Sequence, residues 1–217
     1  MKLVLYLTRN GLLEPLGQSQ VLAYLRGLSR DFSFILITQE KPSDLDDSSG
    51  MARAEQQCEE SGIQWLPRRF WPRSGKVTAA ISVFGMFWSA LNLARRSDVC
   101  LIHARSYLPA GVAWLVWRVT GTPFIFDMRA LWPEEMITAG RLQRGSLVHR
   151  ILRKLERVCL RDAAAVVSLT EAAVEHLHTE YPAELRTQRL VVIPTCADLD
   201  RFALSEERRE SGRVHGC

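Results

Sequence analysis

Hydrophobic positions along the chain gather in short continuous runs, separated by longer stretches in which they recur at helical spacing. Short runs rich in valine, isoleucine, leucine and phenylalanine are typical of strands that are buried on both faces of a sheet. The sequence predicts such strands at residues 2–7, 32–38, 99–104, 123–128, 164–170 and 190–195, with a weaker one at 63–66. Helices are predicted between them, at residues 18–29, 50–61, 76–95, 107–120, 145–161 and 171–180.

This alternation of strands and helices predicts the fold class. Strands joined by crossover helices form a parallel sheet with helices on both faces. We therefore expect an α/β domain over residues 1–202, with a doubly wound, mainly parallel, Rossmann-like sheet. Right-handed crossovers place the carboxyl ends of the strands along one edge, where ligands bind. Residues 203–217 form a charged tail with almost no apolar surface, which predicts a fraying helix or a disordered segment.

One predicted helix raises the question of a membrane. Residues 77–94 carry no charged side chain, and Lys76 and Arg95 flank them. This stretch is at the lower length limit for a spanning helix. Several small and polar residues dilute it, and a membrane span would interrupt the strand–helix pattern. We expect a buried or interfacial helix.

Composition and charge narrow the classes of partner. The 217 residues carry a formal net charge of only +4, which does not indicate a nucleic-acid-binding domain. The five cysteines are scattered without the spacing of zinc ligands, so we expect small buried hydrophobes and no metal site. The chain runs directly into a strand without a secretory signal, which predicts a cytoplasmic location.

The loop that follows the first strand, "NGLLEPLGQSQ" at residues 10–20, falls at the predicted ligand-binding edge. It contains neither the dinucleotide-binding fingerprint nor a P-loop, which disfavours a dehydrogenase and a nucleotide hydrolase. Gly17 at the start of the helix, with Ser19 as a cap, would leave backbone N–H groups accessible to an anion. An ordinary strand–helix connection is the alternative.

Polar side chains end two neighbouring strands of the predicted sheet. His103 and Arg105 alternate onto one side of their strand, and Asp127 and Arg129 do the same on theirs. An acid at the end of a buried strand is costly unless it is paired or functional. Asp127 therefore either forms an ion pair with Arg129 or interacts with a substrate hydroxyl. The residues that follow, 132–135, are expected to form a loop.

The predicted helix 145–161 has two different faces. Its apolar stripe is expected to pack on the sheet, and its basic stripe either contacts anionic lipid headgroups or is solvated. The apolar stripe comprises Val148, Ile151, Leu152, Leu155, Val158 and Cys159, and the basic stripe comprises Arg150, Arg153, Lys154, Arg157 and Arg161.

Five motifs in the chain resemble the amino-terminal half of bacterial family 4 glycosyltransferases of the GT-B type. They are, in order, "LLEPLGQSQVLAYLRGLS", "HARSYLPA", "PFIFDMRALWPEE", "SLTEAA" and "VIPTCADLDRF". The resemblance implies two facing Rossmann-like domains, of which the amino-terminal one binds the acceptor and the carboxy-terminal one binds a nucleotide-sugar donor. It also implies transfer with retention of anomeric configuration and without a metal or cofactor, the nucleotide-sugar being a co-substrate.

The resemblance also suggests roles for individual residues. Gly17 is expected to lie close to the donor diphosphate. Arg129 is expected to supply positive charge to the departing phosphate, whereas Ala130 replaces an acid of many relatives and cannot bind a hydroxyl. We infer that Asp127 takes part of that role. The expected acceptor-binding residues are Glu14, Gln18, His103, Arg105 and Glu134.

The family's donor-binding domain follows the last motif, where this sequence stops. The expectation is a truncated enzyme, or one half of a two-chain enzyme, with negligible transfer by itself and with Leu12, Leu13 and Trp132 exposed towards the missing half. The expected function is sugar transfer from a nucleotide-sugar to a glycan or lipid-linked acceptor in polysaccharide biosynthesis, in the cytoplasm or on the inner face of its membrane. A non-catalytic module that binds a membrane surface or a carbohydrate is the alternative.

Overall fold

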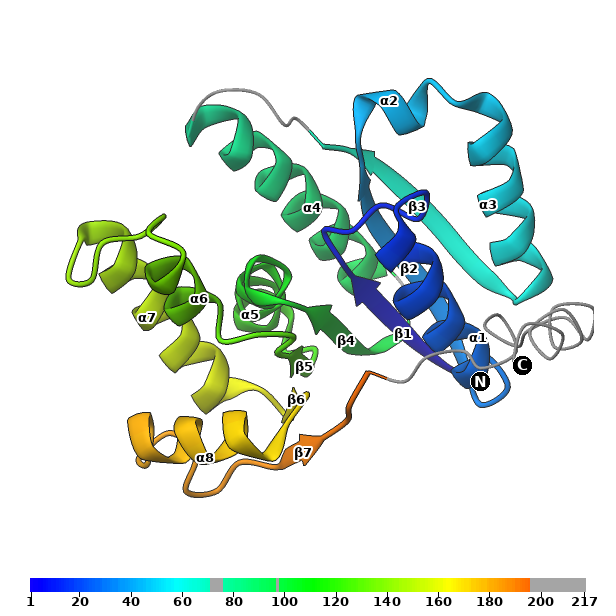
Figure 1. The fold of residues 1–217 in the computed structure, drawn as a ribbon. Helices are drawn as coiled ribbons and strands as arrows, with labels where there is room; N and C mark the ends of the chain where they lie inside the picture. The colour runs from blue at the N-terminus through cyan, green and yellow to red at the C-terminus, as the bar shows by residue number, and fades with distance from the viewer. Residues whose placement is uncertain (71–75, 97, 196–217) are drawn as a thin grey trace, which may run out of the picture.

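A parallel sheet of seven strands organises the computed structural model, which describes residues 1–70, 76–96 and 98–195 (Figure 1). The strands are β1 (Lys2–Leu7), β2 (Phe32–Glu40), β3 (Ile63–Arg69), β4 (Val99–Arg105), β5 (Phe124–Asp127), β6 (Ala165–Ser168) and β7 (Leu190–Val192). Their order is β3-β2-β1-β4-β5-β6-β7. The chain winds outward from β1 to β3, returns to β4 beside β1 and then winds outward again to β7. The predicted doubly wound, Rossmann-like fold is confirmed.

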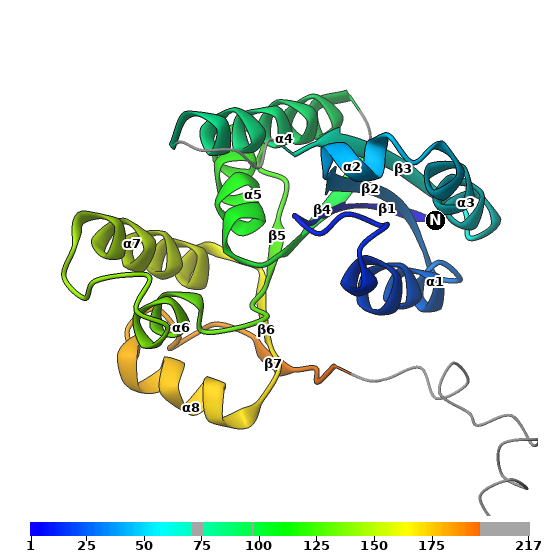
Figure 2. The ribbon, with the colours of Figure 1, turned by 45° about the horizontal axis from the view of Figure 1, so that its top comes forward.

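Helices connect the strands and cover both faces of the sheet. They are η1 (Gly17–Leu22), α1 (Ala23–Leu28), α2 (Pro42–Leu45), α3 (Ser48–Glu60), α4 (Lys76–Arg96), α5 (Tyr107–Thr120), α6 (Trp132–Thr138), α7 (Leu147–Asp162) and α8 (Glu171–Glu180). Figure 2 shows α4 and α5 on one side of the sheet and α1 on the other.

Strand alternation produces two separate hydrophobic cores. In β1, Leu5 and Leu7 join the core beneath α4, α5 and α7, whereas Val4 and Tyr6 join the core beneath α1 and α3. Both faces of each central strand are therefore apolar, as the continuous hydrophobic runs predict. Polar side chains are tolerated mainly where a strand ends, and this places the chemistry of the molecule at the edge of the sheet.

Three segments differ from the predicted elements. The first helix begins as a π-helical segment, η1, before it continues as α1, and π-helical turns are frequent at functional sites. The short helix α2 was not predicted. The loop expected at residues 132–135 is wrong, because α6 begins at Trp132. Pro133 suits the first turn of a helix, and Glu134 and Glu135 interact favourably with its dipole there.

The helix α4 contains the uncharged stretch 77–94 and lies against the sheet, as expected. No helix of the described chain is both long and apolar enough to cross a membrane. Met86, Ala90 and Leu91 of α4 belong to the core, whereas Phe84 and Trp88 are exposed and stack on each other. The helix is thus buried on one side only.

The two stripes of α7 are only partly as predicted. Leu152 and Cys159 are buried, but Val148 and Ile151 are exposed, so the expectation that both pack on the sheet is wrong. They lie in the first turns of α7, before the helix reaches the main core. Several cations of the basic stripe are paired with carboxylates: Arg153 with Glu156 and Glu180, Arg157 with Glu184, and Arg161 with Asp162.

The three apolar side chains expected to be exposed near the ligand-binding edge are more buried than predicted. Leu12 is fully buried against β2 and α1, and Leu13 and Trp132 are half-buried, so the expectation of three exposed side chains is wrong.

The domain boundary predicted at residue 202 and the charged tail, residues 203–217, lie outside the described residues. That division stays a prediction.

A buried carboxylate, Glu156, joins three helices at the β5–β6 side of the sheet. Its Oε1 accepts a hydrogen bond from the Tyr107 hydroxyl of α5 at 2.5 Å, and its Oε2 accepts one from the Tyr181 hydroxyl just beyond α8. The Arg153 guanidinium stacks on Tyr181 and lies 3.4 Å from Glu156 Oε2. The carboxylate thus accepts hydrogen bonds from two buried hydroxyls and lies next to a cation.

We expect Glu156→Ala to lower the free energy of unfolding by about 3 kcal/mol, because it leaves the hydroxyls of Tyr107 and Tyr181 buried without an acceptor. Urea denaturation would measure the change. Glu180→Ala, which removes an exposed partner of the same Arg153, is the matched control and should cost less than about 1 kcal/mol. Equal effects of the two substitutions would contradict this interpretation.

Candidate functional site

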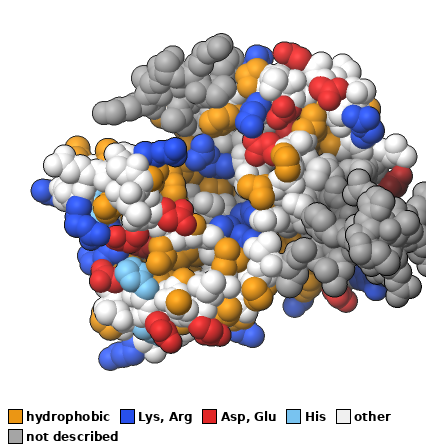
Figure 3. Space-filling view, viewed as in Figure 1, with side chains coloured by type: hydrophobic (Ala, Val, Ile, Leu, Met, Phe, Trp, Pro, Cys, Tyr) orange, Lys and Arg blue, Asp and Glu red, His pale blue; other side chains and the backbone are white. Residues whose placement is uncertain are grey.

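A pocket of about 380 Å³ opens at the carboxyl edge of the sheet, where the direction of strand addition reverses between β1 and β4. Ligands of doubly wound folds bind at this position. Basic side chains gather around a hollow in this part of the surface (Figure 3). The pocket is lined by Tyr6, Ser19, Gln20, Ala23, Tyr24, His103, Arg105, Asp127, Arg129, Val167, Ile193, Pro194 and Thr195.

Strand register brings the polar groups together. Tyr6 of β1 pairs with His103 of β4, and Arg105 of β4 pairs with Asp127 of β5. The backbone N–H of Ser106 then donates to the Asp127 carbonyl at 2.8 Å, which ties the ends of the two strands together. Ser106 has a φ of 76° and a ψ of 175°, a strained conformation for a residue other than glycine. Such strain is often found next to ligand sites.

Asp127 is the buried carboxylate of the pocket. Its Oδ2 lies 3.3 Å from His103 Nε2 and its Oδ1 lies 3.6 Å from Arg129 Nη1. Oδ1 is buried and accepts no hydrogen bond from the described residues. Burial opposes ionisation of Asp127, but the hydrogen bond and charge of His103 and the charges of Arg129 and Arg105 outweigh it, so the pKa lies below its usual value. The group is therefore a charged hydrogen-bond acceptor at neutral pH.

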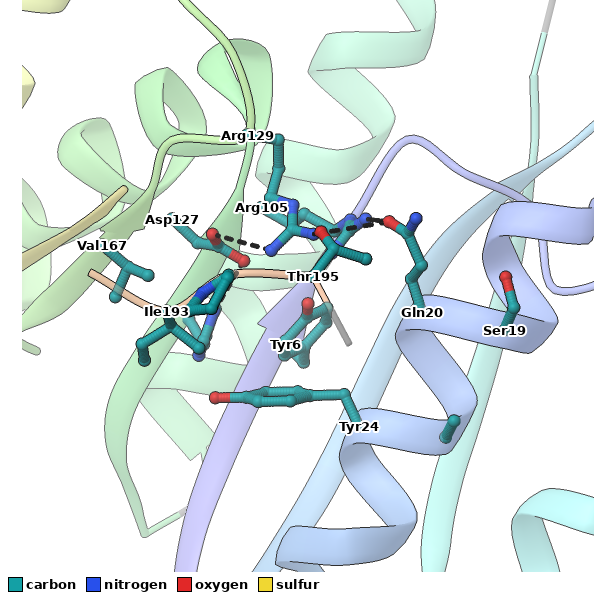
Figure 4. A pocket seen from close by; sticks show the side chains of 13 residues that line it. Tyr6, Ser19, Gln20, Tyr24, Arg105, Asp127, Arg129, Val167, Ile193 and Thr195 are labelled. Carbon is teal, nitrogen blue, oxygen red and sulfur yellow. Dashed lines mark hydrogen bonds and ion pairs between the residues drawn. The ribbon is translucent and has the colours of Figure 1, made fainter. Parts of the chain in front are cut away.

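Two arginines approach one amide oxygen on the opposite side of the pocket (Figure 4). Gln20 Oε1 accepts from Arg105 Nη2 at 2.5 Å and from Arg129 Nη2 at 3.4 Å. Arg129 Nη2 also donates to Thr195 Oγ1 at 2.6 Å. Arg129 thus contacts residues from β5, η1 and the segment after β7. The cavity is rich in hydrogen-bond donors.

Aromatic rings form one wall of the pocket. The Tyr6 ring lies 4.6 Å from the His103 ring, and the Tyr24 ring lies 5.9 Å from it. Burial raises the pKa of both tyrosines, and the negative charge of Asp127 raises them further. The Tyr6 hydroxyl is buried and, within the described chain, lacks a hydrogen-bond partner of good geometry. Both phenols are therefore neutral at physiological pH, and the Tyr6 hydroxyl is a donor to which a hydroxylated ligand can bind.

The crowded loop at residues 10–20 folds back on itself and on β2. Glu40 Oε1 accepts from Leu12 N at 2.8 Å and from Thr38 Oγ1 at 2.6 Å. The Glu40 carboxylate is fully buried, and burial raises its pKa. A Cβ on Gly17 would overlap the carbonyl oxygen of Gly11 and would lie 2.8 Å from Leu12 Cα. The glycines therefore allow close packing of the loop itself.

The predicted site residues divide into two groups. His103, Arg105, Asp127 and Arg129 line one pocket, as their strand positions predict.

The other predicted residues lie elsewhere. Gly17 is buried against Gly11, outside the pocket lining, and its expected position near a diphosphate stays a prediction. Glu14 pairs with Lys41 at 2.7 Å, and Gln18 Nε2 donates to the Leu12 carbonyl at 2.8 Å, so both brace the loop. Glu134 pairs with Arg144 and lines a neighbouring cavity of about 690 Å³, which also touches Arg129.

Several lining residues were not predicted from the sequence. Tyr6 was taken only as part of an apolar run, although its place next to the carboxyl end of β1 is the signal that was available. Gln20 and Tyr24 carry no comparable signal, because their positions depend on how η1 and α1 are set against the sheet. Among residues 1–70, 76–96 and 98–195, no group of three or more histidines, cysteines or acids is placed to hold a metal ion.

Comparison with known sequences gives a family. The family model described as "Glycosyl transferase 4-like domain" matches residues 18–196. No curated protein sequence matches the chain.

Solved structures with the same fold are distant in sequence. Sucrose-phosphate synthase from Thermosynechococcus elongatus has a TM-score of 0.68 at 12% identity, covering 98% of this chain and 53% of that one. Anabaena HepE in complex with UDP and glucose has a TM-score of 0.57 at 14% identity, covering 97% and 49%. Arabidopsis thaliana UGT89C1 complexed with UDP has a TM-score of 0.58 at 13% identity, covering 100% and 56%. This chain therefore spans about half the length of these structures.

We expect Gly17→Ala to lower the free energy of unfolding by about 2 to 3 kcal/mol, because the added methyl group has no space beside Gly11. Chemical denaturation would test this. Gly27→Ala in α1 is the matched control: its Cβ meets nothing within 4 Å, and the substitution should stabilise the helix by about 0.5 to 1 kcal/mol. A Gly17→Ala variant as stable as the original protein would show that the loop is less tightly packed than described.

Proposed function

The chain belongs to the glycosyl transferase 4-like domain family, and we propose that it forms the acceptor-binding side of an enzyme that transfers a sugar from a nucleotide-sugar to an acceptor hydroxyl. The acceptor is a glycan or a lipid-linked sugar of polysaccharide biosynthesis. The observation that carries the proposal is the Asp127 carboxylate, which is buried, ionised and free of hydrogen bonds at Oδ1 within the described residues. Arg129 lies beside it at 3.6 Å.

The residues suggest how the transfer proceeds. Because the pKa of Asp127 is low, the carboxylate is a weak general base and serves mainly to accept a hydrogen bond from the reacting hydroxyl. The acceptor oxygen bonds to the anomeric carbon, the bond to the diphosphate breaks, and the proton passes to the departing phosphate. The Arg129 guanidinium supplies positive charge to that phosphate. We further propose that configuration is retained and that no metal is required, as the family resemblance implies.

A second lobe is part of this proposal. The pocket lies open at the edge of the sheet, and the solved structures of this fold are about twice as long as the chain. Anabaena HepE and Arabidopsis thaliana UGT89C1 were solved with UDP. We propose that a donor-binding lobe, in the same polypeptide or in a second one, closes over Arg129 and supplies the remaining contacts to the nucleotide-sugar. A site that depends on two walls stabilises the transition state poorly with one.

The 217-residue chain alone should bind sugars without transferring them. We expect no release of nucleoside diphosphate from UDP-glucose, UDP-galactose or GDP-mannose, and saturation-transfer NMR should detect binding of at least one of the methyl glycosides of glucose, galactose and mannose. Asp127→Asn should weaken that binding about tenfold, because a charged acceptor is lost.

Asp31→Asn, on an exposed turn after α1, is the control that should leave binding unchanged. Turnover by the chain alone would contradict the need for a second lobe. Unchanged binding by Asp127→Asn would contradict the role of Asp127.

We also propose that the protein works at an anionic membrane surface, on the cytoplasmic side. The start of α7 exposes Leu147, Val148 and Ile151, with Arg150 and Lys154 on the same turns. Apolar side chains beside cations suit the headgroup region of a bilayer. The other cations of the helix, at residues 153, 157 and 161, are already paired with carboxylates and are poor candidates for lipid contact.

Flotation with phosphatidylglycerol vesicles tests this surface. Neutralising Arg150 and Lys154 together, as Arg150→Gln and Lys154→Gln, should reduce the bound fraction at least fivefold, since each cation near an anionic surface contributes about 1 kcal/mol. Arg157→Gln, which removes a cation paired with Glu184 at 2.9 Å, should change little. An equal loss of vesicle binding in both variants would contradict an electrostatic membrane contact, as would binding to vesicles made only of neutral phosphatidylcholine.

A further inference from the structure

Arg105 is a buried cation that forms no direct ion pair within the described residues. Its residue is only 5% exposed, yet no carboxylate of the described chain lies within ion-pair distance of its guanidinium. It donates instead to a neutral amide oxygen, Gln20 Oε1. Burial of a charge is costly unless an opposite charge accompanies it. The guanidinium of Arg105 therefore lacks a carboxylate in direct contact among the described residues.

Asp127 interacts with the charge of Arg105 at longer range but makes its close contacts with other groups. Asp127 directs Oδ2 to His103 and Oδ1 to Arg129, so both of its oxygens face other groups. Gln20 Oε1, by contrast, accepts hydrogen bonds from the guanidinium groups of both Arg105 and Arg129, and Figure 4 shows these two interactions converging on it. Two cations directed at one oxygen form a site that prefers an anion to an amide. The amide oxygen occupies the position of an anionic oxygen.

We propose that the acceptor carries a phosphate or a carboxylate, which displaces the Gln20 amide and binds between Arg105 and Arg129 while an acceptor hydroxyl meets Asp127. This inference rests on the proposed function, whose acceptor class it specifies. The cavity of about 380 Å³ has room for one phosphorylated or carboxylated sugar unit.

The depth of Arg105 assigns the anion to the acceptor. The Arg129 side chain is 19% exposed and would be met first by a phosphate that arrives from a facing lobe. Arg105 lies deeper, close to Tyr6, whose pKa its charge lowers in opposition to burial. A molecule must be seated inside the pocket to reach it. The acceptor is the substrate that occupies this space in the proposed function.

Calorimetric titration of the 217-residue chain tests the proposal with four probes: glucose 6-phosphate, glucuronate, glucose and UDP. Glucose 6-phosphate or glucuronate should bind at least tenfold more tightly than glucose. Gln20→Glu places a carboxylate of the same shape between the two guanidinium groups. It should raise the melting temperature and reduce the affinity for the anionic sugars at least tenfold. Gln143→Glu, on an exposed turn, is the matched control and should change neither quantity.

Three results would overturn the proposal. They are glucose binding as tightly as both anionic sugars, no binding of either anionic sugar at millimolar concentration, and an unchanged affinity for the anionic sugars in Gln20→Glu. A fourth result would overturn only the assignment of the anion to the acceptor. In that case UDP binds more tightly than glucose 6-phosphate, and UDP binding is lost in Gln20→Glu, which assigns the anion to the donor. These titrations contain no donor sugar and judge only the anion preference, whereas the proposed function is judged separately, by whether Asp127→Asn weakens binding of the neutral methyl glycosides.

Discussion

The backbone register of β1, β4 and β5 is the constraint on which the site depends. Residues opposite each other in these parallel strands, Tyr6 with His103 and Arg105 with Asp127, reach the same edge of the sheet at the same height. Both faces of the strands are covered by helices, so a polar side chain can contact a ligand only at this edge. A shift of one residue in β4 would turn His103 and Arg105 away from the pocket and into the core on the other face. The hydrophobic packing of the strand interiors therefore also fixes the positions of the charged groups.

The loop between β1 and η1 contributes rigidity, and the structure explains its composition. Glu40 binds the backbone of Leu12 from β2, and Gly11 and Gly17 lie too close to their neighbours to carry a side chain. A glycine-containing loop at a ligand-binding edge suggests backbone contact with a phosphate, but here the neighbouring backbone is the loop's own. These contacts hold the loop in place, and η1, which follows it, positions Gln20 next to the two arginines.

The sequence predicted most of the fold, because buried parallel strands produce continuous apolar runs that can be read without any structure. It also identified the charged residues at the ends of β4 and β5, since strand alternation and a shared edge are local properties. It did not identify Gln20, Tyr24 or Thr195, whose places in the pocket depend on how η1, α1 and the segment after β7 lie against the sheet. It also misplaced Leu12, because the burial of a loop residue by β2 and α1 is a tertiary effect that no local pattern records. The start of α6 was missed although Pro133 and Glu134 are typical of a first helical turn.

The bond between Arg129 and Thr195 links the pocket to the part of the chain that leaves the sheet. Thr195 follows β7 by three residues, is exposed, and holds Arg129 Nη2 at 2.6 Å. A movement that carries this segment away from the sheet would break the bond and release one N–H of a guanidinium that also faces Asp127 and Gln20. In the proposed two-lobe enzyme, closure of the second lobe would therefore be coupled to the hydrogen bonding of Arg129 through the segment that follows β7.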